Sequence, residues 1–305
     1  MEKLYVVEND FIDCRLDRWI KKNIGSLPQS LIEKNLRKGI IKVNKKKTKG
    51  FYKLKKNDKI VFYNFNFLSK KHDKEKFRYK PSKKDLTFTS SIFVENNENF
   101  AVINKPAGIS VQSGTKSKKN ILDILRDTDE FKGFIPYTVH RIDKETTGIL
   151  IVAKNRKFAQ LFTALFRIRK IHKTYLGVTI GELNKTKGTL EDILFHYEGE
   201  KKVKSKAITH YKVIDSNNNY SLLLLNPQTG RKHQIRKQLL IHGNPILGDS
   251  KYRITENKRK VKSSLMLHAY KINFSINNVK YNFLANPPDY FMNILKEKYL
   301  KSFLK

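Results

Sequence analysis

One aspartate is the first candidate for chemistry in this sequence. Asp143 lies in the segment HRIDKETTGILIVAKN, between Arg141 and Lys144 and directly ahead of the apolar run 149–153. An aspartate in a turn is most often structural. Here the two threonines and the glycine that follow it predict a tight start to a buried strand, which would hold the loop at one end of a sheet. A positioned, ionised carboxylate can act as a nucleophile or as an electrostatic stabiliser.

A second basic segment, TGRKHQIRK, contributes Arg231 and Arg236 from a distant part of the chain. A cation beside a carboxylate favours the ionised form of the carboxylate. The sequence has no G-x-x-x-x-G-K-[ST] loop, no G-x-G-x-x-G after a predicted strand and no G-x-S-x-G. A single cysteine, Cys14, and eight histidines without an H-x-x-x-H pair give no metal-ligand pattern. We therefore expect chemistry from side chains alone, with no metal and no cofactor.

The composition indicates a polyanionic partner. The 305 residues include 63 Lys and Arg against 28 Asp and Glu, a formal charge of +35. Nucleic acid is the natural partner for such a surface, because Lys and Arg neutralise phosphates. The frequent use of lysine throughout the chain leaves a general compositional bias as the alternative. The start, MEKLYVVENDF, has no apolar stretch after a basic beginning, and no run approaches the ~20 residues of a membrane span. We expect a soluble, cytoplasmic protein and no membrane partner.

Residues 1–63 have the pattern of a small α/β unit. In CRLDRWIKKNI the apolar residues recur at helical spacing. In LPQSLIEKNLRKG, Ser30 and Glu33 predict a capping box at the start of a second helix, and Gly39 predicts its end. The following stretch alternates like short strands joined by lysine-rich turns. Residues 64–85 carry many charges without periodicity, which indicates a linker or an extended arm.

Residues 86–305 have the pattern of a larger domain. Strand-like runs outnumber helical ones and several are joined as hairpins, so we expect an α+β fold with a mixed, mainly antiparallel central sheet and flanking helices. GILIVAK is predicted to be a buried strand, and Asn155 to cap the helix that follows. The helix carries an apolar stripe of Phe158, Leu161, Phe162 and Leu165, which is more typical of a core than of a functional site.

Several motifs, in order, resemble one enzyme family. HRIDKETTGILIVAK is similar to the signature of the RluA/RluC/RluD-type pseudouridine synthases, whose form is H-R-L-D-x-x-T-S/T-G-L-L-L. The segments INKPAGISVQSG, KTYLGV, TGRKHQIRKQL, HGNPILGDSKY and LHA fit further family motifs over most of residues 90–290. Residues 1–63 resemble the small S4-type RNA-binding module that often precedes this catalytic domain. Gln112, after Val111, is more similar to the RluC branch than to the RluD branch.

The resemblance implies isomerisation of uridine in RNA to pseudouridine without a cofactor. Asp143 would be the catalytic carboxylate, by attack on the ribose or by assisting glycal formation. Tyr175 would stack on the target uracil and help to remove the proton from carbon 5. Arg236 would pair with Asp143, and Arg141 would fill the gap left by the flipped uridine. Two alternatives without a catalytic role remain. Tyr175 could be a strand residue of the core, and Arg236 could bind phosphate alone.

The resemblance also implies partners. The substrate would be 23S ribosomal RNA or a precursor of the large ribosomal subunit, bound by a monomeric protein. The RNA-binding face of the first module would consist of basic side chains, some of which are simply solvated: Arg15, Arg18, Lys34, Arg37, Lys38, Lys45 and Lys46. His140 and His233 would be hydrogen-bonded loop residues, and Lys105 and Lys144 structural or phosphate-facing. Lys237-Gln238 departs from the family, which often has a histidine at the second position.

Two other functions stay open on the sequence. A non-catalytic RNA-binding protein of ribosome assembly would need the charge but not the set Asp143, Tyr175 and Arg236. An RNA methyltransferase is disfavoured because the sequence lacks a glycine-rich cofactor loop.

Overall fold

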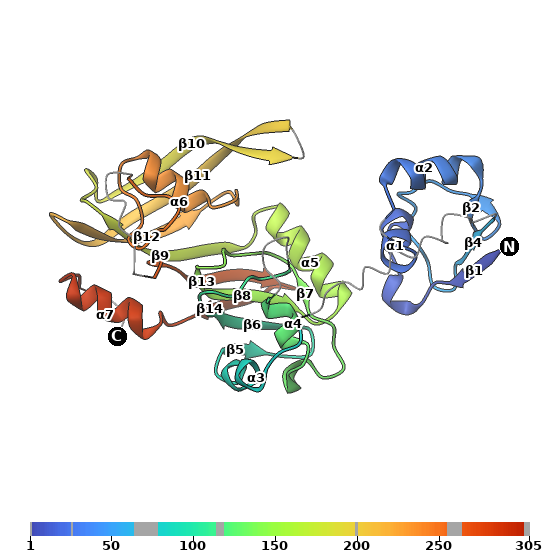
Figure 1. Cartoon of the computed structure of the whole chain (residues 1–305), viewed down its shortest axis with the longest axis horizontal. Coiled ribbons are helices and arrows are strands. Elements are labelled where there is room, and N and C mark those ends of the chain that lie inside the picture. Colours follow the sequence, from blue (N-terminus) through green and yellow to red (C-terminus); the bar gives the residue numbers. More distant parts are fainter. Residues whose placement is uncertain are drawn as a thin grey trace. The chain divides into compact units, whose positions relative to one another are not determined.

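The chain divides into two compact units, residues 1–77 and 78–305, called the first and second units below (Figure 1). The computed structural model describes residues 2–25, 27–63, 79–113, 119–198, 201–254 and 264–301. The division between the units falls inside the predicted linker, residues 64–85, most of which lies outside the described residues.

Helix α3 (Lys83–Thr89) corrects the end of that predicted linker. The Ser82 side chain accepts a hydrogen bond from the Asp85 backbone N–H, and the Asp85 side chain accepts one from the Ser82 backbone N–H, which completes a capping box. The buried Asp85 also forms an ion pair with Lys119. The helix is too short to show an apolar stripe, so periodicity misses it, whereas the Ser-x-x-Asp spacing was a usable signal.

The first unit packs two helices against a small antiparallel sheet. Its sheet has the order β1-β4-β2-β3 and consists of β1 (Lys3–Val6), β4 (Lys59–Phe62), β2 (Ile41–Val43) and β3 (Lys46–Lys47). The helices are α1 (Leu16–Asn23) and α2 (Gln29–Lys38). The predicted apolar face of α1 is buried, with Leu16, Trp19 and Ile20 in a core that also holds Cys14.

Helix α2 begins before the capping box that the sequence predicts. Its N-cap is Pro28, without a side-chain cap hydrogen bond, and Gln29 is its first residue. The Gln29 amide donates to Asp17 at 3.0 Å and to Glu33 at 3.2 Å, so Glu33 contacts a side chain of the first turn and not a Ser30 cap. Gly39 ends the helix as predicted, with φ of 72° in the left-handed region that favours glycine.

The second unit is built on one mixed sheet (Figure 1). The main path has the order β10-β11-β12-β9-β13-β8-β6-β5, with β14 paired to β13 and β7 paired to β8. Only the β13–β8 pair is parallel among the described strands, which confirms the predicted fold class. The strands are β5 (Phe93–Asn96), β6 (Phe100–Lys105), β7 (Tyr137–Thr138), β8 (Thr147–Ala153), β9 (His172–Ile180), β10 (Lys187–Glu198), β11 (Lys201–Asn217), β12 (Tyr220–Pro227), β13 (Leu267–Ile276) and β14 (Val279–Leu284).

Strand β8 is buried on both faces, which explains its unbroken apolar run. Leu150 and Val152 belong to the core cluster that includes helix α4 (Ile121–Leu125). Ile149 and Ile151 belong to the cluster on the opposite face, with helix α5 (Arg156–Arg167). A strand between two cores has no polar face, so its sequence does not alternate.

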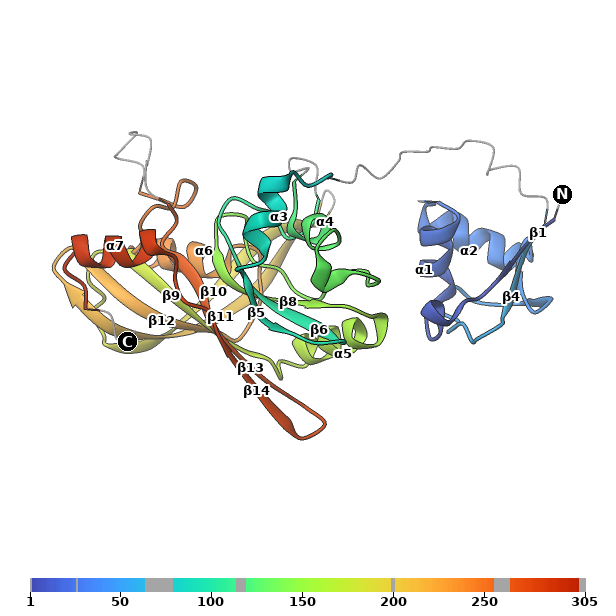
Figure 2. The same ribbon diagram turned by 90° about the horizontal axis from the view of Figure 1, so that it is seen from below.

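Helices cover the sheet in different places. The Asn155 side chain caps α5 by accepting from the Phe158 N–H at 2.9 Å, and the predicted apolar stripe of α5 packs into the core. Helices α6 (Gln234–Ile241) and α7 (Asp289–Glu297) pack into one cluster with strands β9 and β12. The β13–β14 hairpin projects from the rest of the second unit (Figure 2).

Within the described parts of the chain, none of the helices combines the length and the apolar character that a membrane span requires.

Candidate active site

The Asp143 loop is anchored where β8 begins beside β13. Gly148 has φ of 104°, and a Cβ there would lie 2.3 Å from the carbonyl oxygen of Ala269 in β13. Only glycine permits this close parallel pairing. Next to it, Thr147 Oγ1 lies 2.8 Å from Nδ1 of the fully buried His268. The threonine and glycine after Asp143 therefore fix the loop at the sheet end.

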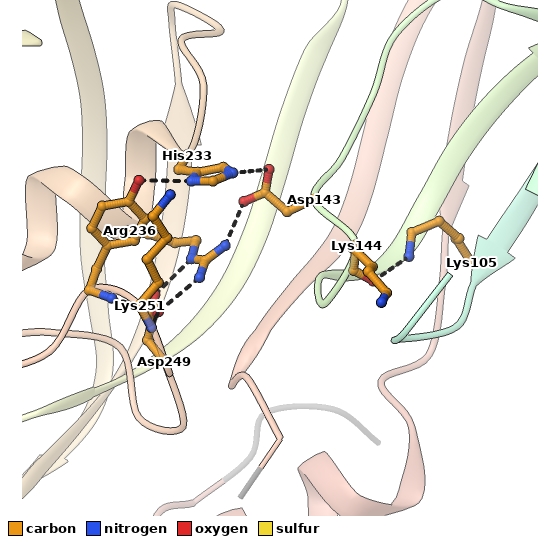
Figure 3. Close-up of polar contacts among 8 residues, drawn as sticks. Lys105, Asp143, Lys144, His233, Arg236, Asp249 and Lys251 are labelled. Atoms are coloured by element: carbon orange, nitrogen blue, oxygen red, sulfur yellow. Dashed lines mark hydrogen bonds and ion pairs between the residues drawn. The ribbon is translucent and has the colours of Figure 1, made fainter. Parts of the chain in front are cut away.

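Lys105, at the end of β6, ties a second loop to the Asp143 loop. Its side chain is fully buried, and Nζ donates to the carbonyl oxygens of Pro106 at 2.6 Å and Ile109 at 3.0 Å. Nζ also donates to the carbonyl oxygen of Lys144 at 3.2 Å (Figure 3). Burial lowers the pKa of Lys105 to about 7, although Glu145 and then Asp143 raise it. Lys105 is thus structural, one of the two alternatives that the sequence left open.

Asp143 and Arg236 meet although 93 residues separate them (Figure 3). Arg236 Nη1 donates to Asp143 Oδ2 at 3.1 Å, and their side chains are 6% and 22% exposed, respectively. Arg236 lies in α6 and Asp143 in the loop before β8, so the contact joins the two halves of the sheet. A charge-assisted hydrogen bond of this kind stabilises the carboxylate and fixes its orientation.

Asp249 holds the other side of the same guanidinium. Its Oδ2 accepts from Arg236 Nε at 2.7 Å and its Oδ1 from Arg236 Nη2 at 2.8 Å, with the Asp249 side chain fully buried (Figure 3). The N–H groups of Lys251 and Tyr252 also donate to Asp249. Burial raises the pKa of Asp249, but the Arg236 and backbone hydrogen bonds outweigh it and lower the pKa below its ordinary value. The sequence reasoning missed this residue, although its segment GDSKY was among the matching motifs.

His233 lies on the free side of the Asp143 carboxylate. It is the N-cap residue of α6, in the left-handed region with φ of 54°, and its Nε2 is 3.6 Å from Asp143 Oδ1. Its Nδ1 is 2.8 Å from the Tyr252 hydroxyl. Burial lowers the pKa of His233, Asp143 raises it, and Arg236 lowers it further. The net lowering keeps His233 neutral at pH 7, so Arg236 supplies the positive charge at Asp143.

A cavity of about 320 Å³ opens at Asp143. Tyr175 in β9 and Arg141 in the Asp143 loop both line it, together with Arg236. Burial, and next the charge of Asp143, raise the pKa of Tyr175 above its ordinary value, so its phenol is neutral at physiological pH. The cavity volume is within the ~300–1,000 Å³ of small-ligand sites. The four second-unit residues singled out from the sequence thus come together at one cavity.

His140, next to Arg141 in the chain, is unable to act as a proton carrier near neutral pH. Burial, followed by the charge of Lys173, lowers the pKa of His140 to about 3. Its Nε2 accepts from the Ile151 N–H at 2.8 Å, and its ring stacks on Phe166. It is a hydrogen-bonded loop residue.

Gln238 occupies the position where the sequence departs from the family. Its side chain is fully buried and accepts from Thr209 Oγ1 at 2.7 Å. Its amide nitrogen donates to the carbonyl oxygens of Leu190 and Ala207 and to Asp192. The glutamine therefore joins α6 to β10 and β11, so at this position it supports the helix that carries Arg236.

The seven basic residues predicted for the first unit are all exposed. They lie next to or within α1, in α2, and in the turn from β2 to β3. Arg15 forms an ion pair with Asp17 at 2.5 Å, so its charge is partly neutralised within the first unit. In the tight β2–β3 turn, Asn44 and Lys45 both have positive φ, which presents Lys45 to solvent.

Comparison with known proteins identifies the family of this chain. Residues 99–240 match the family of RNA pseudouridylate synthases. The ribosomal large subunit pseudouridine synthase C of Rickettsia felis is 35% identical over 300 residues, covering 93% of this chain and 96% of that protein. The enzyme of the same name from Buchnera aphidicola subsp. Schizaphis graminum is 32% identical, covering 88% of each. The chain belongs to the RNA pseudouridylate synthase family and is an isomerase.

Solved structures share the fold. Human RNA pseudouridylate synthase domain containing 4 aligns with a TM-score of 0.62 at 24% identity, over 72% of this chain and 98% of that one. Human RNA pseudouridylate synthase domain containing 1 aligns with a TM-score of 0.55 at 22% identity, over 69% and 87%. At these identities the likeness establishes the fold alone.

Proposed function

We propose that this protein converts uridines of 23S ribosomal RNA, free or in a precursor of the large subunit, to pseudouridine, with Asp143 as the catalytic carboxylate. The observation that carries the proposal is the 3.1 Å contact between Asp143 and Arg236 at a cavity that Tyr175 also lines. The names of the full-length relatives, which refer to the large ribosomal subunit, support the RNA class.

The reaction rearranges bonds without changing the atoms of the nucleotide. The bond from C1′ to N1 breaks, the uracil turns, and a bond from C1′ to C5 forms while C5 loses a proton and N1 gains one. Asp143 acts as the ionised carboxylate, by attack on C1′ or by removing the proton from C2′ in a glycal route. Arg236 donates to one carboxylate oxygen at 3.1 Å, and the other faces the neutral His233. Arg236 keeps the charge in place throughout.

Tyr175 holds the uracil through its ring. Because its pKa is raised, Tyr175 enters the reaction as a neutral phenol, and its ring stacks on the uracil. It accepts the proton from C5 only after giving up its own. Arg141, on the same cavity wall, takes the space that the flipped nucleotide leaves in the RNA stack. Flipping costs a few kcal/mol, which phosphate contacts to the basic surface offset.

The first unit acts as an S4-type RNA-binding module. Its exposed basic residues, Arg15, Arg18, Lys34, Arg37, Lys38, Lys45 and Lys46, contact phosphates and increase the affinity for ribosomal RNA. The protein works as a monomer in the cytoplasm.

Pseudouridine mapping on 23S rRNA tests the proposal. The purified protein is incubated with an unmodified 23S rRNA transcript and with large-subunit precursors, and pseudouridines are mapped by carbodiimide modification. New pseudouridines at defined positions are expected with one of the two substrates. RNA binding without any pseudouridine in either substrate would favour the non-catalytic assembly protein. Pseudouridine in another RNA class alone would contradict the assignment to the large subunit.

A further inference from the structure

A larger cavity adjoins the Asp143 cavity and is lined by cations. Its volume is about 760 Å³, and it shares Arg141, Lys173, Tyr175 and Arg231 with the smaller one. Arg167 and Arg169, from the end of α5, complete its basic lining, and His172 and His210 also face it. None of the described residues that line it is Asp or Glu. The cavity therefore attracts negative charge along one continuous wall that leads to Asp143.

These cations lack acidic partners in the described part of the chain. Arg167, Arg169 and Lys173 form no ion pair there. Arg231 donates from Nε to a backbone carbonyl, that of Lys206, at 3.2 Å. Burial lowers the pKa of Lys173, with no neighbouring acid to counter it. For the half-buried Lys173, an anionic ligand would supply the missing counter-charge.

Arg169 occupies a backbone position that favours glycine. Its φ is 59°, and it follows the last residues of α5, where its N–H donates to the Phe166 carbonyl at 3.2 Å. Helices commonly end with glycine in this left-handed conformation, because a Cβ is strained there. An arginine at this position therefore opposes the backbone preference for glycine. That side chain is exposed and lines the larger cavity.

We propose that this cavity is a phosphodiester-binding subsite for the RNA strand that flanks the target uridine, with Arg167 and Arg169 as its outer ligands and Lys173 on the wall next to Tyr175. The proposal rests on the proposed function, since it takes RNA as the substrate of the adjoining site. Successive phosphates of one strand would fit a row of cations that continues from one cavity into the next. Contacts of this kind fix the register of the strand without reading its sequence.

Binding of single-stranded RNA measures the contribution of the two arginines. A fluorescein-labelled RNA of mixed sequence is titrated with the full chain, with Arg167→Ala and with Arg169→Gly. Each variant is expected to bind about tenfold more weakly. The slope of log K against log salt should fall by ~0.7 for each phosphate that is no longer neutralised. Lys157→Ala, which removes an exposed cation from the other end of α5, is the matched control and should weaken binding less than either. Equal weakening in all three would overturn the subsite.

Arg169→Gly separates binding from structure. Glycine relieves the strained backbone, so the melting temperature should stay constant or rise while RNA affinity falls. An arginine that only ended the helix would give the same thermal result with unchanged RNA affinity. That second outcome contradicts the proposal.

A neutral-linkage scan locates the contact along the RNA. Single methylphosphonate linkages, which carry no charge, are placed at successive positions around a uridine that the enzyme converts. With the wild-type protein, affinity should fall at one or two linkages beside that uridine. With the double variant Arg167→Ala/Arg169→Gly, the same linkages should weaken binding little further, as a double-mutant cycle requires for a direct contact. Independent, additive effects would sink the assignment.

Failure of the subsite and failure of the proposed function give different results. If the arginine variants bind and convert 23S rRNA like the wild type, the subsite is wrong and the function stands. If the wild type makes no pseudouridine but its RNA binding depends on Arg167 and Arg169, the function is wrong, and the phosphate contacts of the two arginines stand without a target uridine.

Discussion

The two adjoining cavities of the second unit differ in how their charges are used. At the smaller one, Arg236 is paired on both sides, with Asp143 at 3.1 Å and with Asp249 at 2.7 and 2.8 Å. At the larger one, Arg167, Arg169 and Lys173 have no acidic partner among the described residues. The ion pairs of Arg236 fix the orientation of the Asp143 carboxylate, whereas the unpaired cations of the larger cavity are available to bind an anionic ligand. The comparison separates a region built for bond rearrangement from one built for holding a polyanion.

Arg236→Ala should have the largest effect on the paired region. The change leaves Asp143 unoriented and Asp249 buried without a counter-charge. The rate of pseudouridine formation should fall about 10²–10³-fold, as when one preorganised electrostatic partner is removed. The free energy of unfolding should fall by ~3–5 kcal/mol, because a buried charge loses its partner. Single-turnover kinetics and urea unfolding measure the two effects. An unchanged rate with reduced stability would mean that Arg236 stabilises the fold but takes no part in the reaction.

Asp249→Asn should lower the rate less, through the orientation of Arg236. Asparagine accepts one hydrogen bond from the guanidinium but loses the bidentate pairing. The single-turnover rate should fall about 10–100-fold with RNA affinity unchanged, since small displacements at a reacting group have effects of this size.

The matched control for Asp249 is Asp85→Asn, which also removes a buried, paired acid from the second unit. It should lower stability and leave the rate intact. A similar loss of rate in both variants would mean that Asp249 acts through stability alone.

The pH dependence of stability tests the core behind the Asp143 loop, where burial keeps His268 neutral. Burial lowers the pKa of His268 to about 4, below its ordinary value of 6.5. The unfolded chain therefore binds a proton at His268 below pH 6.5, whereas the folded protein does not until about pH 4. His268 contributes stability that is present above pH 6.5 and declines by up to ~1.4 kcal/mol per pH unit as the pH falls toward 4. Urea unfolding between pH 7 and 5 should show a smaller decline for His268→Gln, and an identical decline would contradict this assignment.

The first unit should show the smallest effect, because its basic residues lie on an exposed surface. Lys45→Ala/Lys46→Ala removes two cations of the β2–β3 turn that have no described ion pair. RNA affinity should fall only a few-fold, with the salt slope reduced by ~0.7 for each phosphate left without its lysine and an unchanged single-turnover rate at saturating protein. A greater fall in affinity than that of Arg167→Ala would reverse the ranking of the two RNA-binding regions.

The main features of the fold follow from local sequence patterns. The run 149–153 predicted a buried strand, Asn155 a helix start and Gly39 a helix end, and the structure contains all three. The prediction at Ser30 was wrong because Pro28 and Gln29 begin the helix instead. The end of the linker was wrong because α3 is too short for periodicity to reveal.

Parts of the site depend on contacts that no local pattern records. The family resemblance singled out Asp143 and Arg236, but not Asp249. The contact between Asp249 and Arg236 depends on the chain after α6 folding back against that helix. The sequence is compatible with a structural or a phosphate-facing Lys105, and only its three carbonyl partners in the structure distinguish the two. The basic cavity joins the end of α5, β9 and the loop after β12, which are distant in sequence.

The central claim is that the carboxylate of Asp143 carries out the chemistry. Asp143→Asn keeps the shape of the side chain and leaves Arg236 paired with Asp249, while it removes the negative charge. The decisive measurement is single-turnover pseudouridine formation on 23S rRNA by this variant, with RNA affinity determined on the same sample. We predict affinity within about twofold of the wild type and no detectable pseudouridine. Pseudouridine formation by the variant at a rate near that of the wild type would contradict the account.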